Sequence, residues 1–140
     1  MSVIWRKLKS ELSKGSGTTR EQGRKYNKRK VGSEQEEIAV HFLQSKGYEI
    51  IEQNYFCRFG EIDIICKDGK YLVFVEVKYR ANRKMGTPEE AISTYKMQHI
   101  IKAAQSYLYE KRYSMDAPVR FDVVVILGKD IRVIQDAFEI

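Results

Sequence analysis

Two apolar runs joined by a short polar turn dominate the middle of the chain, in the stretch GEIDIICKDGKYLVFVEVKYR at 60–80. Both runs are rich in β-branched and aromatic residues, which is typical of β-strands. Asp68-Gly69 between them is a strong signal for a two-residue hairpin turn. We therefore predict an antiparallel hairpin with Lys67 opposite Lys70, and any fold of the chain must accommodate it.

This turn determines which side chains share a face of the sheet. It places Asp63 opposite Phe74 and Glu61 opposite Glu76, and directly opposed residues project from the same face. Side chains alternate along a strand, so four charged residues are expected on one face. They are Glu61, Asp63, Glu76 and Lys78. A shift of the pairing by one residue would send Asp63 to the opposite face.

Three carboxylates and one lysine on a mostly apolar sheet need something to neutralise them. Mg²⁺ binds carboxylate oxygens and completes its shell with water and phosphate oxygens. A lysine beside such a metal can orient or deprotonate a water, and attack of that water on a phosphodiester is metal-assisted hydrolysis. In the structural alternative, Lys78 only forms an ion pair with Glu76 or Glu61 at the end of the sheet.

The remaining periodicity predicts two helices and three further strands. The first helix is expected to begin at an N-cap, Ser33, whose capping box is completed by Glu36, and to end at Gly47. The second covers 95–111, and whether it starts there or at the Thr87 N-cap stays open. The strands are expected at 48–56, 119–127 and 131–135, the last at an edge. This order predicts an α/β fold with a mixed sheet flanked by helices.

The charge of the chain is concentrated at its N-terminus. Of 25 basic and 19 acidic residues, residues 1–31 hold ten and two, which leaves 15 and 17 for residues 32–140. We therefore expect a basic, largely disordered arm over 1–31 and one domain over 32–140. Such an arm suits nucleic acid first and an anionic membrane surface second, or has no partner at all. No apolar run approaches about 18 residues, so no membrane span is expected and a cytoplasmic protein is the default.

The motifs GEIDII and FVEVKYR, with Asp63, Glu76 and Lys78, resemble the signature of the PD-(D/E)XK nucleases. The whole of 32–140 also resembles the YraN-like family of that superfamily, through GSEQEEIA, GYEIIEQN, VRFDVVVI and QDAF. Archaeal Holliday junction resolvases are a more distant likeness. The resemblance implies a restriction-endonuclease-like αβββαβ core and an Mg²⁺-dependent endonuclease, with Mn²⁺ as a substitute. The implied substrate is DNA, including branched DNA.

The resemblance also implies a role for each matching residue. Asp63 and Glu76 would bind the metal, the Val77 carbonyl would be a third ligand, and Glu36 would reach toward the metal from the first helix. Lys78 would be the catalytic lysine, acting with Asp63 and Glu76. Glu61 would contact these ligands without itself binding the metal.

Basic residues near these motifs are candidates for positioning phosphates, with ordinary solvated surface as the alternative for each. They are Arg58, Arg80, Arg83, Lys84 and Lys96. For Glu36 the alternative is a capping role alone. For the whole protein the alternative is a nucleic-acid-binding module that keeps the nuclease fold without catalysis. A homodimer stays open.

Overall fold

The computed structural model describes residues 25–82 and 93–138, with side chains from residue 33 onward, and holds two helices and five strands there. They are α2 (Lys25–Ser45), β1 (Glu49–Cys57), β2 (Gly60–Asp68), β3 (Tyr71–Arg80), α3 (Thr94–Glu110), β4 (Val119–Leu127) and β5 (Asp130–Phe138). The strands form one sheet in the order β1-β2-β3-β4-β5, in which β3 and β4 are parallel and the other pairs antiparallel. The predicted α/β fold with a mixed sheet is confirmed. Neither described helix is long and apolar enough to cross a membrane.

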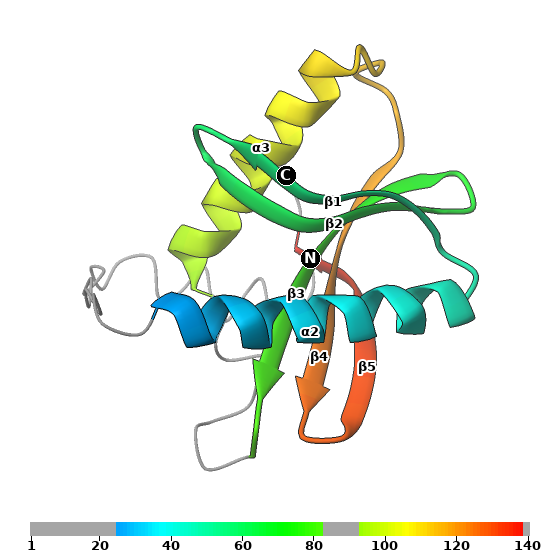
Figure 1. Ribbon diagram of the computed structural model, residues 1–140. Coiled ribbons are helices and arrows are strands. Elements are labelled where there is room, and N and C mark those ends of the chain that lie inside the picture. The colour runs from blue at the N-terminus through cyan, green and yellow to red at the C-terminus, as the bar shows by residue number, and fades with distance from the viewer. Residues whose placement is uncertain (1–24, 83–92, 139–140) are drawn as a thin grey trace.

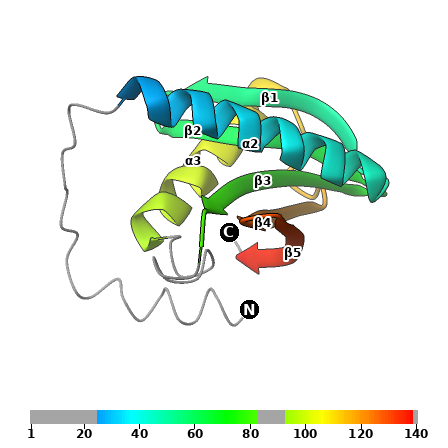
Figure 2. The ribbon, with the colours of Figure 1, turned by 60° about the horizontal axis from the view of Figure 1, so that its bottom comes forward.

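The sheet lies between α2 and α3, with one apolar core on each side (Figures 1 and 2). Alternate residues of β3 divide between the two cores, as the pleat requires. Leu72 and Phe74 pack with apolar residues of α3. Val73 and Val75 pack with apolar residues of α2. Because β3 is apolar on both faces, it can occupy the centre of the sheet.

The hairpin turn lies one residue later than the sequence predicts. Asp68 pairs with Tyr71, so Gly69 and Lys70 form the turn and the prediction of an Asp68-Gly69 turn is wrong. Gly69 has φ +58° and takes the first turn position, where a type II′ turn requires glycine. The pairing therefore moves by two positions, and Phe74 faces Ile65. An even shift preserves the faces of both strands.

The structure tests the predicted starts of both helices. The described part of α2 begins at Lys25, so the prediction that Ser33 caps this helix is wrong. The lysine- and arginine-rich segment before Ser33 has good helix propensity and continues the helix upstream, across part of the expected arm. For α3, Ser93 is the N-cap and its side chain accepts a hydrogen bond from the Lys96 N–H at 3.1 Å. The alternative cap, Thr87, lies outside the described residues.

A buried hydrogen-bond network joins β2, β4, β5 and Tyr48, the residue before β1, at the end of the sheet near the β2–β3 turn. Asp122 on β4 is fully buried. Its Oδ2 accepts from the Tyr48 hydroxyl and from Arg120 Nη2, each at 2.9 Å. Arg120 also donates to Asp68 Oδ2 on β2 at 2.7 Å, and Gln135 on β5 donates to the Tyr48 hydroxyl at 2.8 Å. With its donors in place, the buried Asp122 carboxylate is fully compensated.

We expect Asp122→Ala to destabilise the protein strongly, because it leaves the Arg120 guanidinium and the Tyr48 hydroxyl short of an acceptor. Breaking a buried charged pair costs about 3–5 kcal/mol, and urea unfolding followed by circular dichroism measures it. The matched control is Asp130→Ala at the exposed β4–β5 turn, which should change the free energy of unfolding by less than about 0.5 kcal/mol. Equal effects of the two substitutions would contradict a structural role for the network.

Candidate metal centre

Strands β2 and β3 separate at one end of the sheet. The predicted site residues lie at this point of separation. Their pairing stops at Ile64 and Val75. Beyond that point β2 stays paired with β1 as far as Gly60, and β3 stays paired with β4 as far as Arg80. Figure 1 shows β1 and β2 curving away from β3. We call this region, with residues 60–63 of β2 and 76–80 of β3, the split.

Asp63 lies at the base of the split. One residue beyond the last pair, the register puts Asp63 across from Glu76, where the sequence predicts a diagonal contact. The Val77 N–H donates to Asp63 Oδ2 at 2.9 Å. A side-chain carboxylate thus accepts from β3 where a backbone carbonyl of β2 would accept in a continuous ladder. The structure therefore positions Asp63 through the strand that carries Glu76.

Glu36 and Glu61 approach Asp63 from the side of the sheet covered by α2. Carboxylate oxygens of these three residues lie within 4.8 Å of one another. The Asn54 amide lies between the two glutamates, and in the orientation that suits both it donates to Glu36 Oε2 at 2.7 Å and to Glu61 Oε1 at 2.8 Å. Glu36 therefore reaches the site from the helix.

Glu61 does not face Glu76, so this part of the sequence prediction is wrong. The regular alternation of β2 breaks at Asp63, because Ile62 packs in the core under α3 and Ile64 in the core under α2. In an unbroken strand these two residues would share a face. Asn54, across from Asp63 on β1, has φ +54°. This left-handed residue interrupts the regular strand geometry at the same point.

Glu76 and Lys78 project on the α3 side, the face that begins with Leu72 and Phe74. Glu76 is only 3% exposed, and its Oε1 lies 3.3 Å from Lys78 Nζ and 3.9 Å from Lys96 Nζ. Its other oxygen, Oε2, is buried and accepts no hydrogen bond from the described residues. A buried carboxylate oxygen without a donor is costly unless a ligand completes its contacts.

Burial and crowding of the carboxylates raise two pKa values. Burial, and next the charge of Glu76, raise the pKa of Asp63 to about 7, while the Val77 N–H and Lys96 act in the opposite direction. Burial, followed by the charges of Asp63 and Glu61, raises the pKa of Glu36 to about 7, against the hydrogen bond from Asn54. Each shift reflects burial of the carboxyl group first and the negative charge of its neighbours second.

These observations test whether a metal ion suits the site. The donors are all oxygens, three of them converge, and a fourth carboxylate has an oxygen without a partner. Oxygen ligands of this kind suit Mg²⁺ or Mn²⁺, and a divalent cation would relieve the repulsion that raises the pKa values. The residues Glu36, Glu61, Asp63 and Glu76 therefore fit a divalent metal.

The basic residues predicted from the sequence lie in four different places. Lys96 lies at the site, through Glu76. Arg80 is half-buried at the end of β3, where its Nη1 donates to the Tyr79 carbonyl at 2.9 Å. Arg58 lies at the β1–β2 turn, exposed. Arg83 and Lys84 lie outside the described residues. The roles given to all of them stay predictions.

Asn54 is the site residue that the sequence analysis missed. Its place between two carboxylates depends on the fold, but one signal was available. Asparagine is unfavourable inside a strand and tolerates the left-handed region, so an asparagine within YEIIEQNYF marks an interruption of β1.

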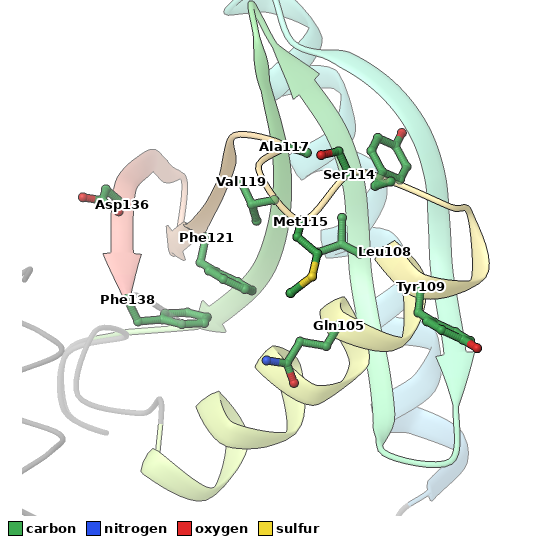
Figure 3. A pocket seen from close by; sticks show the side chains of 11 residues that line it. Gln105, Leu108, Tyr109, Ser114, Met115, Ala117, Val119, Phe121, Asp136 and Phe138 are labelled. Carbon is green, nitrogen blue, oxygen red and sulfur yellow. The ribbon is translucent and has the colours of Figure 1, made fainter.

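A pocket of about 660 Å³ lies away from these carboxylates, between α3, the segment after it, and strands β4 and β5 (Figure 3). Its walls are mostly apolar, and Asp136 is the one charged residue among those that line it. Leu108, Met115 and Phe121 point into it. Asp136 is its one carboxylate, and none of the residues of the candidate metal centre lines it.

Comparison with known proteins gives a consistent result. The model of the uncharacterised protein family UPF0102 matches residues 35–126. The chain is similar to the UPF0102 protein of Lachnoclostridium phytofermentans, with 48% identity over 81% of this chain and 96% of that protein. A UPF0102 protein of Geotalea uraniireducens is 46% identical over 79% and 90%. UPF0102 protein VP0448 of Vibrio parahaemolyticus is 41% identical over 80% and 94%.

The raised pKa values lead to a prediction about stability. A carboxyl group whose folded-state pKa lies above its unfolded value favours folding at low pH, and that contribution is lost as the pH rises through about 7. Without metal, the wild type should therefore lose stability between pH 5 and pH 8. At pH 8, Asp63→Asn and Glu36→Gln should each melt higher than the wild type by roughly 4 °C, in thermal unfolding with a chelator present.

The control for this prediction is Glu34→Gln, an exposed position on the same helix, which should melt with the wild type. Added Mg²⁺ should raise the melting temperature of the wild type more than that of Asp63→Asn. A lower melting temperature for both site variants at pH 8 would show that the carboxylates are structural and compensated.

Proposed function

The chain belongs to the uncharacterised protein family UPF0102, and from the geometry of its own residues we propose that it is a metal-dependent nuclease that hydrolyses phosphodiester bonds in DNA. One observation carries the proposal. Asp63 and Glu76 lie across the split from each other, close enough for the charge of Glu76 to raise the pKa of Asp63, and Lys78 Nζ lies 3.3 Å from Glu76 Oε1. Two carboxylates with a lysine beside them are the elements of metal-assisted phosphodiester hydrolysis.

The metal would be held by Asp63 and Glu76, with Glu36 beside them and Glu61 in contact with Glu36 through Asn54. Whether the Val77 carbonyl also contributes stays a prediction. When bound, Mg²⁺ or Mn²⁺ would polarise the phosphoryl group and offset the charge that develops on its oxygens. Glu76 Oε2 supports this assignment, because it accepts no hydrogen bond from any residue that the structure describes and a ligand would supply that contact.

Lys78 is the residue best placed to act on the attacking water. Hydrolysis adds a water oxygen to phosphorus and breaks one ester P–O bond. The Lys78 side chain is 20% exposed, so its ammonium can reach solvent while Glu76 restrains it. From that position Nζ can orient the water and hold or release a proton. Lys96, whose side chain is 39% exposed, is placed to contact a phosphate oxygen of the substrate.

DNA is the substrate that charge and likeness favour. Lys78 and Lys96 lie at the split, and the first 31 residues carry ten basic side chains against two acidic ones. Such a distribution attracts a polyanion. The resemblance of the GEIDII and FVEVKYR motifs to PD-(D/E)XK nucleases supports DNA, and the more distant likeness to junction resolvases makes branched DNA the first structure to assay.

Cleavage of labelled DNA in Mg²⁺ tests the proposal. We expect Asp63→Asn and Glu76→Gln to abolish detectable cleavage and Lys78→Ala to slow it by about 10²–10⁴-fold, the usual contribution of one proton-transferring group. A chelator should stop the wild type, and Mn²⁺ should restore it. The assay should compare single-stranded, duplex and four-way-junction DNA.

Glu49→Gln provides a matched control, because this exposed carboxylate lies at the opposite end of β1; it should cleave at the wild-type rate. Activity that survives all three site substitutions would overturn the proposal. DNA binding that persists with no cleavage in any metal would instead favour the non-catalytic binding module.

A further inference from the structure

A groove lies between the β1–β2 turn and α3, and none of the site carboxylates lines it. It has a volume of about 600 Å³. Its walls combine cationic, aromatic and hydrogen-bonding side chains, and the residues are Arg58, Phe59, Lys102, Gln105, Ser106 and Tyr109. No acidic side chain is among them. The nuclease proposal above uses none of these residues, and only Arg58 was predicted from the sequence to position a phosphate.

No described acidic residue forms an ion pair with either of the two cations of this groove. Arg58 and Lys102 are both exposed, and neither forms an ion pair with a described residue. The Arg58 guanidinium instead lies over the Phe59 ring, 4.6 Å from its centre. This cation–π contact orients the guanidinium and leaves its N–H groups free for an anion.

The groove also presents an aromatic ring to solvent. Tyr109 is 88% exposed, and Figure 3 shows its ring turned outward from α3, away from Phe121 and Phe138. A large aromatic side chain this exposed contributes little to the core. Aromatic rings beside uncompensated cations are the arrangement that proteins use to bind single-stranded nucleic acid, with bases stacked on the rings and phosphates on the cations.

The groove and the split both border α3. The Gly60 backbone, where β2 begins, approaches α3 so closely that a Cβ placed there would lie 3.7 Å from the His99 Cβ. Lys96, one turn earlier on α3, lies beside Glu76. From Lys96 to Tyr109 the helix rises about 20 Å. That length would span about six nucleotides at the 3.4 Å rise of a B-form strand.

We propose that this groove binds an unpaired nucleic-acid strand that flanks the bond to be cleaved, with a base stacked on Tyr109 and phosphates held by Arg58 and Lys102. The strand must be unpaired, because bases stacked within a duplex do not offer their faces to a side chain. The location of the cleaved bond rests on the proposed function, whereas binding of the strand to the groove does not.

Fluorescence anisotropy with labelled oligonucleotides, in a chelator that prevents cleavage, tests this directly. We expect Tyr109→Ala to weaken binding of a short single strand by about tenfold, since one base–aromatic stack contributes about 1–3 kcal/mol. Tyr109→Phe should bind as the wild type does, because it keeps the ring. Affinity for a blunt duplex of the same sequence should change by less than about twofold in both variants. DNA and RNA strands are compared in parallel.

The salt dependence separates the cations from the ring. Lys102→Ala should reduce the slope of log affinity against log salt by about 0.7 for a single strand, the value for one lost phosphate contact. The matched control is Lys67→Ala, which should leave the slope unchanged. Lys67 is an exposed lysine at the end of the β1–β2 hairpin that lies away from its turn. Thermal unfolding checks that each variant is folded.

Two results would overturn the inference: equal single-strand affinity in the wild type and Tyr109→Ala, or an equal loss for single strand and duplex. Its failure is distinguishable from failure of the nuclease proposal, because Asp63→Asn removes cleavage alone and should bind the single strand at least as tightly as the wild type. Normal cleavage by Asp63→Asn would overturn the nuclease proposal and leave the groove measurement intact.

Discussion

The end of pairing between β2 and β3 is the constraint on which the site depends. Up to Ile64 and Val75 the two strands form an ordinary ladder. Past that point each strand keeps only its outer neighbour, so the inner edges of β2 and β3 offer backbone groups that need other partners. Asp63 supplies one of them to the Val77 N–H. The end of the ladder thus also holds a carboxylate beside Glu76.

The stability of this arrangement comes from elsewhere in the sheet. The carboxylates around Asp63 repel one another, whereas the apolar cores on both faces and the Asp122 network hold the strands together. Local instability at one point of an otherwise consistent fold is common at functional sites. The lysines moderate it, since Lys78 and Lys96 both approach Glu76.

Alternation and turn residues allowed the fold to be predicted from the sequence, along with most of the residues that meet at the site. The turn was misplaced because Asp68-Gly69 and Gly69-Lys70 are both plausible hairpin turns, and the Arg120 contact that keeps Asp68 in the strand is long-range. The predicted faces of Glu76 and Lys78 are still correct, because the pairing was displaced by an even number of positions. The predicted face of Glu61 is wrong, since the left-handed Asn54 interrupts the regular strand geometry that the prediction assumed. The helix start failed because a local capping pattern cannot show whether the chain upstream also becomes helical.

The hairpin of β1 and β2 is fastened at one end, near Asp68, and free of β3 at the other. The curvature of this hairpin sets how far Glu61 lies from β3, while the hydrogen bond from the Val77 N–H keeps Asp63 beside Glu76. Substitutions at exposed positions of β1 can change this spacing without altering the residues of the two cores. In the proposed metal centre, a preference for one cation radius over another would in this sense be a property of β1, a strand that contributes Asn54 to the site and no carboxylate.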